Sequence, residues 1–253
     1  MADTHAADLI QRLGAPAEIR DAVSKLVDDL TRAAGKNLKG LILYGGLARG
    51  RYRHGKSDIN LVVVLGDASA ESLAVIAPVL RAAWRAVRIE PFIVQVSDVP
   101  RLAAVFPTKV LDIQSHRVVL MGEDPFAGVE VSREQIRLRV EQGLSNLALR
   151  LRRRYISIFD DPRSMASALA DAAVPFKVEL AAMLRLVGKD EPSESTSAAV
   201  LEFAAMTFDL DRDALSLMAG LRRDGSLPEN LPAFYDRVLA SISRAAEIVS
   251  NME

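Results

Sequence analysis

The residues that could carry chemistry lie together in residues 41–64, the segment LILYGGLARGRYRHGKSDINLVVV. Gly45 and Gly46 end a short apolar run, and glycines in such a turn let backbone N–H groups approach a phosphate closely. Asp58 and Asn60 stand two residues apart at the start of the next apolar run, so their side chains share one face of a strand. Oxygen ligands beside a glycine turn suit a magnesium-triphosphate site and nucleotidyl transfer.

The loop between these two runs is basic, and it carries Arg49, Arg51, Arg53 and Lys56 close to the glycine pair. Such charge can bind a polyphosphate, and Arg49, the nearest to the glycines, is the first candidate. The alternative is that at least two of the four are ordinary solvated surface charges. The glycine pair alone also fits a plain tight turn, and its combination with the Ser57-Asp58 pair favours a ligand site.

This segment resembles the nucleotidyltransferase superfamily, typified by DNA polymerase beta and the aminoglycoside nucleotidyltransferases. Those proteins have a glycine-serine pair followed, after a short loop, by Asp-x-Asp on the next strand. Strand, glycine turn, basic loop, acid pair and second strand occur here in that order. Two positions depart from the family pattern, since Gly46 replaces the usual serine and Asn60 replaces the second aspartate.

The resemblance implies a set of site residues. Asp58 is expected to be catalytic and to bind Mg²⁺ together with Asn60, and the nucleotide is expected to contact Gly45, Gly46, Arg49, Lys56 and Ser57. Because an asparagine attracts a cation less than a carboxylate does, one bound metal, or none, is expected in place of two.

The family also uses a third carboxylate from a later strand, and the best candidate by position is Glu90 in VRIEPFIV. Asp98 and Asp112 are alternatives, because Pro91 disturbs the strand beside Glu90. Glu90 also fits an ordinary exposed strand residue.

Two functions follow from the resemblance. The first is transfer of a nucleoside monophosphate from a triphosphate, with ATP the expected nucleotide, to a hydroxyl of an unknown acceptor, either a small molecule or a protein. The second is a catalytically impaired derivative that serves as a nucleotide-binding or protein-interaction module, and Asn60 and Gly46 favour it.

Helical and strand patterns alternate up to about residue 122, and only helical periodicity follows from Ser132. The predicted fold therefore begins with an α/β (α+β) nucleotidyltransferase-like domain at residues 1–125. The resemblance implies that this domain contains a small mixed sheet. An all-helical bundle of about five helices follows at residues 126–253. Ser132, with Gln135 three residues later, is the predicted start of the first bundle helix.

Composition narrows the class further. The 253 residues include no cysteine, which excludes a disulfide framework. The three histidines, at positions 5, 54 and 116, are too scattered for a histidine zinc site. The formal charge of the chain is −1. With no basic leader and no apolar run long enough to span a bilayer, a cytoplasmic protein without membrane contact is expected.

Nucleic-acid binding is disfavoured by the net charge and by only 5% aromatic residues. The helix predicted at 132–159 carries seven arginines against two glutamates, which fits a solvated face, a basic wall beside the nucleotide or a surface for an acidic partner. Relatives of the aminoglycoside type also pair across a dimer, so the resemblance admits a homodimer.

Overall fold

The computed structural model describes residues 2–55, 57–190, 192, 196–224 and 227–252. The chain divides into two compact units, Met1–Val131 and Ser132–Glu253. Each unit is described by itself below.

The first unit is built on a four-stranded sheet in the order β3-β2-β1-β4. Its strands are β1 (Leu38–Tyr44), β2 (Ile59–Leu65), β3 (Ile89–Gln95) and β4 (Arg117–Gly122). Strand β1 runs antiparallel to β2 and β4, and β2 runs parallel to β3. The predicted small mixed sheet is therefore confirmed.

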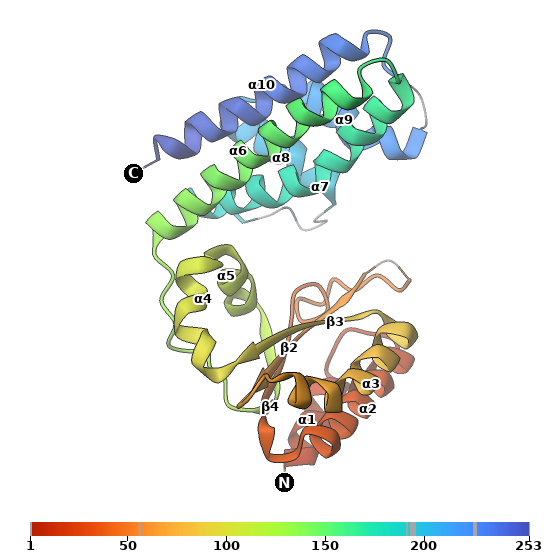
Figure 1. Ribbon diagram of the computed structural model, residues 1–253, viewed down its shortest axis with the longest axis vertical. Coiled ribbons are helices and arrows are strands. Elements are labelled where there is room, and N and C mark those ends of the chain that lie inside the picture. The colour runs from red at the N-terminus through yellow and green to blue at the C-terminus, as the bar shows by residue number, and fades with distance from the viewer. Residues whose placement is uncertain (1, 56, 191, 193–195, 225–226, 253) are drawn as a thin grey trace. The chain divides into compact units, whose positions relative to one another are not determined.

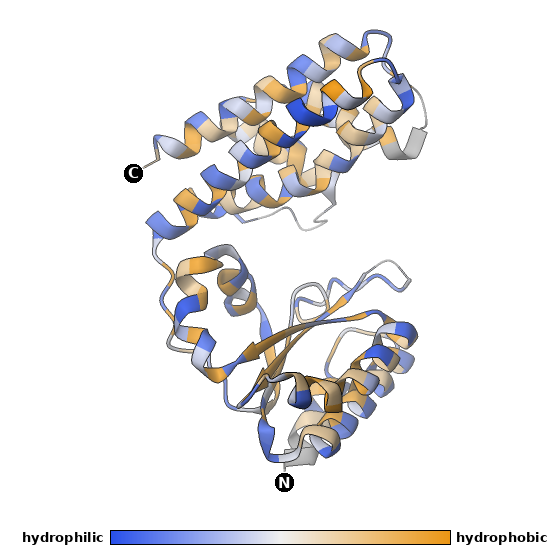
Figure 2. Ribbon diagram, viewed as in Figure 1, coloured by the Kyte–Doolittle hydropathy of each residue, from blue (hydrophilic) through white to orange (hydrophobic). Residues whose placement is uncertain are grey.

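Helices cover both faces of this sheet (Figure 1). One face packs on α1 (Ala2–Gln11), α2 (Ala17–Ala34) and α3 (Ala70–Val87). The other packs on α4 (Val99–Val105) and α5 (Pro107–Ser115). Both central strands are buried on both faces, as their unbroken apolar runs predict, and Figure 2 shows them as an apolar layer between helices with polar outer faces.

Strand β3 lies at the edge of the sheet, where the Pro91 position predicts it. The buried residues of α2 fall at the three-to-four spacing of an amphipathic helix. The segment between Val99 and Ser115 has no clear pattern in the sequence. It forms the two short helices that cover the sheet face beside Asn60.

The second unit is helical throughout its described residues. It contains α6 (Arg133–Ile158), α7 (Pro162–Leu186), α8 (Ser197–Phe208), α9 (Arg212–Asp224) and α10 (Leu231–Ser250). The predicted start of α6 is confirmed, since the Ser132 hydroxyl accepts from the Gln135 amide at 3.1 Å and the Gln135 side chain accepts in return at 3.0 Å. The break between α8 and α9 is at Asp209, whose φ of 53° is left-handed.

One carboxylate is buried inside this helical unit. Glu179 on α7 is 8% exposed, and burial raises its pKa although Arg139 on α6 lies 3.4 Å away and opposes the shift. Gly143 faces this carboxylate, and a Cβ at that position would lie 2.1 Å from Glu179 Oε1. The glycine therefore makes room for a buried carboxylate that pairs with a partly exposed arginine between two packed helices.

Candidate active site

A row of polar side chains crosses one end of the sheet. Tyr44 on β1 lies opposite Asn60 on β2, and Asn60 lies opposite Glu90 on β3. Residues directly opposite in neighbouring strands point to the same face, so all three share the face covered by α4 and α5. Sheet register thus brings Glu90 beside Asn60, while Tyr44 is fully buried and Glu90 is exposed.

The glycine turn follows Tyr44 at the end of β1 and lies next to Asn60. Gly45 has a φ of +73°, a backbone conformation that favours glycine. A Cβ at this position would also lie 2.7 Å from Asn60 Nδ2, so a larger residue would have to displace the Asn60 amide. Gly46 has no such constraint, because the nearest atom to its Cβ position is the Arg51 carbonyl oxygen at 3.9 Å. The glycine at position 45 is therefore structurally required, and the one at position 46 is not.

The turn after β1 leaves backbone donors open. The Arg49 amide donates to the Gly45 carbonyl at 3.0 Å and the Arg51 amide to the Gly46 carbonyl at 2.8 Å, which winds the segment into one helical turn. Among the described residues, no hydrogen bond uses the amides of Gly46, Leu47 and Ala48. Three successive open N–H groups form the kind of concavity that binds an anion.

Arg49 links this turn to the helix that covers the sheet. Its Nη2 lies 2.5 Å from Asp112 Oδ1 and donates to Ser115 Oγ at 3.1 Å. Its Nε is buried and makes no hydrogen bond within the described chain. Arg49 therefore has a structural partner on α5 and one unused donor, and Asp112, one of the alternatives for the third carboxylate, is already paired.

Asp58 lies one residue before β2 and pairs with a cation. Its Oδ1 lies 2.8 Å from Nε of Arg88, the residue just before β3. This distance is short enough for an ion pair. The buried oxygen nevertheless makes no hydrogen bond, because a hydrogen bond also requires that the N–H group point at the oxygen. Asp58 thus has its charge balanced and part of its hydrogen-bonding capacity unfilled.

The remaining predicted residues separate into three cases. Ser57 closes the basic loop, since its hydroxyl accepts from the Arg53 amide at 3.0 Å and its amide donates to the Arg53 carbonyl at 2.9 Å. Lys56 lies outside the described residues. Asp98 accepts from the Gln95 amide at 3.1 Å beyond the opposite end of β3, so it is remote from the polar row.

A further ionisable side chain, Lys109 on α5, lies on the same face of the sheet. Its Nζ lies 4.8 Å from the centre of the Tyr44 ring and 5.3 Å from that of Phe92. Burial lowers the pKa of Lys109, and the charges of Asp112 and Glu90 act in the opposite direction. Burial also raises the pKa of Tyr44, and the same two carboxylates add to that shift. No local sequence signal marks Lys109, because its segment reaches the site only through helix packing.

The magnesium site implied by the resemblance can be tested against these residues. The described part of the chain has no group of three or more His, Cys, Asp or Glu side chains arranged to hold a metal. Asp58 is paired with Arg88, and Asn60 offers a neutral amide packed on Gly45. Two adjacent divalent ions need several negative ligands, so these residues do not fit a two-metal clamp.

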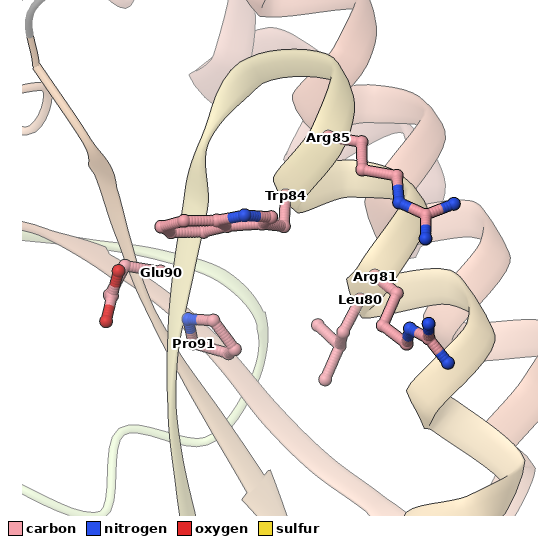
Figure 3. Close-up of a pocket in the computed structure, with 6 residues that line it drawn as sticks. All are labelled: Leu80, Arg81, Trp84, Arg85, Glu90 and Pro91. Carbon is pink, nitrogen blue, oxygen red and sulfur yellow. The ribbon is translucent and has the colours of Figure 1, made fainter.

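A groove of about 400 Å³ lies beside the edge strand β3. Figure 3 shows the Trp84 ring reaching from α3 over the strand near Pro91, whereas the Arg81 and Arg85 side chains point away from it. Pro91 lies opposite Leu61 in the register, on the face covered by α1 to α3. Glu90 also lines the groove, which therefore follows the edge strand and opens mainly on the other face of the sheet from Tyr44 and Asn60.

No helix in the ranges that the structure describes is long and apolar enough to cross a bilayer. In the second unit, Arg137 pairs with Glu134 at 2.7 Å and with Glu141 at 3.4 Å, whereas the side chains of Arg152, Arg153 and Arg154 are exposed. The arginine-rich end of α6 is thus a basic, solvated surface.

Comparison with known proteins supports the fold. No protein-family model and no curated protein sequence matches the chain. The structure is similar to a crystal structure of spectinomycin adenyltransferase from Enterococcus faecialis with ATP and spectinomycin, with a TM-score of 0.57 and 13% identity. The similarity covers 88% of this chain and 98% of that chain. The chain therefore has a nucleotidyltransferase-like fold with a helical C-terminal part.

Proposed function

We propose that the first unit binds a nucleoside triphosphate, ATP by preference, and transfers its nucleoside monophosphate to a hydroxyl group. The observation that carries this proposal is the order of the row: Glu90 lies beside Asn60, and Asn60 packs against Gly45 at the start of the turn with open amides. Such a transfer uses donors that hold phosphate oxygens and a carboxylate that can take the proton of the acceptor hydroxyl. The similar spectinomycin adenyltransferase, whose structure contains ATP, supports the choice of nucleotide.

In the proposed reaction, the acceptor hydroxyl oxygen attacks the α phosphorus, pyrophosphate leaves, and Glu90 takes the hydroxyl proton. The amides of residues 46–48 would hold phosphate oxygens, and Arg49 supplies positive charge to the same turn. Asp58 and Asn60 stay predicted magnesium ligands. No step of the proposal depends on a resident metal, and magnesium can also enter as part of the substrate MgATP.

A second candidate function is a nucleotide-binding or protein-interaction module without catalysis. It is favoured by the Asp58-Arg88 ion pair and by the neutral amide at position 60, because both weaken the attraction for a catalytic cation. The acceptor class, the homodimer and the cytoplasmic location stay predictions under either function.

The first test is calorimetric titration of ATP into the full chain, with magnesium and with EDTA. We expect ATP to bind, and Asp58→Ala, which removes a predicted magnesium ligand, to weaken the binding in magnesium. Absence of binding to the parent chain in both buffers would contradict the proposal and leave a scaffold for protein contacts.

Transfer is tested separately with ATP labelled at the α phosphate and spectinomycin as the first acceptor, followed by other polyhydroxylated compounds. Glu90→Gln keeps the shape of the side chain but cannot take a proton, so we expect it to bind ATP as the parent does and to lose label transfer. If the parent chain and Glu90→Gln bind ATP equally and neither transfers label to any acceptor, the result would favour the non-catalytic binding module.

A further inference from the structure

The ammonium group of Lys109 lies against two aromatic rings on the sheet face that carries the proposed site. The distances from Nζ to the ring centres of Tyr44 and Phe92 are 4.8 and 5.3 Å. An ammonium at this range is attracted by the electron-rich face of each ring. The side chain is partly buried, and this burial lowers its pKa.

Sheet register places this ammonium beside the nucleotide-binding end. Tyr44 is directly opposite Asn60, and Phe92 is two residues from Glu90 on the same face of β3. One helical turn after Lys109, Asp112 holds the Arg49 side chain of the glycine turn. Helix α5 thus connects a lysine, a carboxylate and the predicted phosphate-binding arginine in one layer over the site.

The charges of this layer balance without an added ion. Asp58 is paired with Arg88 at 2.8 Å, and Asp112 with Arg49 at 2.5 Å. Glu90 is within electrostatic reach of Lys109. Each carboxylate near the site therefore has a cation supplied by the chain, and a further divalent ion would meet repulsion from three side chains.

We propose that Lys109 is the resident cation of the nucleotide site and binds the triphosphate, in place of a metal that a second aspartate at position 60 would hold. The proposal rests on the nucleotide binding proposed above. Compared with the family pattern, asparagine at position 60 removes one negative charge from the row of polar side chains. Lys109 adds a positive charge on the same face of the sheet, so both features favour the binding of an anion over that of a metal ion. Burial lowers the pKa of Lys109, and a bound phosphate would favour its charged form.

The test compares ATP affinity by calorimetry, in magnesium and in EDTA, for the parent chain, Lys109→Met and Lys109→Arg. Methionine keeps the apolar contact with the rings and removes the charge, while arginine keeps the charge. Lys36→Met is the control, because Lys36 is exposed at the opposite end of β1. Thermal unfolding of each variant checks that the unit is folded.

We expect the parent to bind ATP with about the same affinity in both buffers, and Lys109→Met to weaken binding by about tenfold or more. Lys109→Arg should retain most of the affinity, and Lys36→Met all of it. The double variant Asn60→Asp with Lys109→Met should recover binding only in magnesium, since it exchanges the lysine for a metal ligand.

Two results would overturn the proposal and leave nucleotide binding intact: parent-like affinity in Lys109→Met, or a parent chain that binds ATP only with magnesium. A parent chain that binds no ATP in either buffer contradicts the proposed function, and the role of Lys109 with it.

Discussion

Strand β2 is flanked by two aspartates that occupy different environments. Asp67, after the strand, accepts from the Ser69 and Ser72 hydroxyls at 2.6 and 2.5 Å and from the Ser69 amide at 3.3 Å, at the start of α3. Asp58, before the strand, has one ion pair with Arg88 and a buried oxygen without a hydrogen bond. The carboxylate of Asp67 is filled by local donors and fixes a helix start, whereas that of Asp58 keeps hydrogen-bonding capacity that no local donor fills.

The same contrast holds for the glycines at the two ends of the sheet. At the Asp67 end, a Cβ on Gly122 would lie 1.9 Å from the Lys39 carbonyl oxygen and 2.9 Å from Gly40 Cα, which are backbone atoms. At the Asp58 end, a Cβ on Gly45 would meet the side chain of Asn60. One end is closed by backbone packing, and the other is bounded by side chains and open amides.

The largest expected effect is at the closed end. Gly122→Ala places a Cβ against the backbone of β1 at a φ of +75°, and the sheet cannot move aside without losing the pairing of β1 with β4. We expect a loss of about 3–5 kcal/mol in the free energy of unfolding, measured by denaturant titration. Gly128→Ala is the control, since no atom lies within 4 Å of its Cβ position. Equal stability of the two variants would show that the closed end is not held by backbone packing.

At the open end, Gly45→Ala and Gly46→Ser should differ. Alanine at 45 adopts a left-handed conformation at a cost of about 1–2 kcal/mol and displaces the Asn60 amide, so both stability and ATP affinity should fall. Serine at 46, the residue usual in the resembled family, has room and no backbone strain, so stability should stay unchanged. Thermal unfolding and ATP titration of both variants measure this difference, and similar losses for the two would contradict the separate roles given to these glycines.

The smallest effects on stability, and the most specific, come from the two aspartates. The Ser69 and Ser72 hydroxyls lower the pKa of Asp67, so its contribution to stability is present above the ordinary pKa of Asp and is lost as the pH falls through the lowered value. Asp67→Asn should therefore lower the unfolding temperature at pH 7, and the gap from the parent should close below about pH 4. The midpoint of thermal unfolding as a function of pH gives the answer.

Asp58→Asn is the matched variant for Asp67→Asn. Because the Asp58-Arg88 pair is 40% and 51% exposed, its loss should change stability by only about 0.2–1 kcal/mol. ATP binding in magnesium should weaken, because Asp58 is a predicted magnesium ligand. A fall in unfolding temperature as large as that of Asp67→Asn would show that Asp58 also serves the fold, and would remove the contrast between the two ends of β2.

Periodicity and turn residues were sufficient to predict the main elements. Helix α2, the buried strands β1 and β2, the edge position of β3 and the Ser132 cap follow from local patterns that act within a few residues. The short helices α4 and α5 were not predicted, because their apolar spacing is weak and their packing partner is a sheet face made by distant strands.

The residues able to do the chemistry can be named from the amino-acid sequence: a glycine turn, one aspartate with an asparagine in place of its partner, and a carboxylate on a later strand. How these groups are paired depends on the fold. Sheet register places Glu90 beside Asn60, and helix packing brings Lys109 and Asp112 over the site. The physical reason is that residue type fixes the charge a side chain can carry, whereas the charge that balances it comes from segments that only folding brings together.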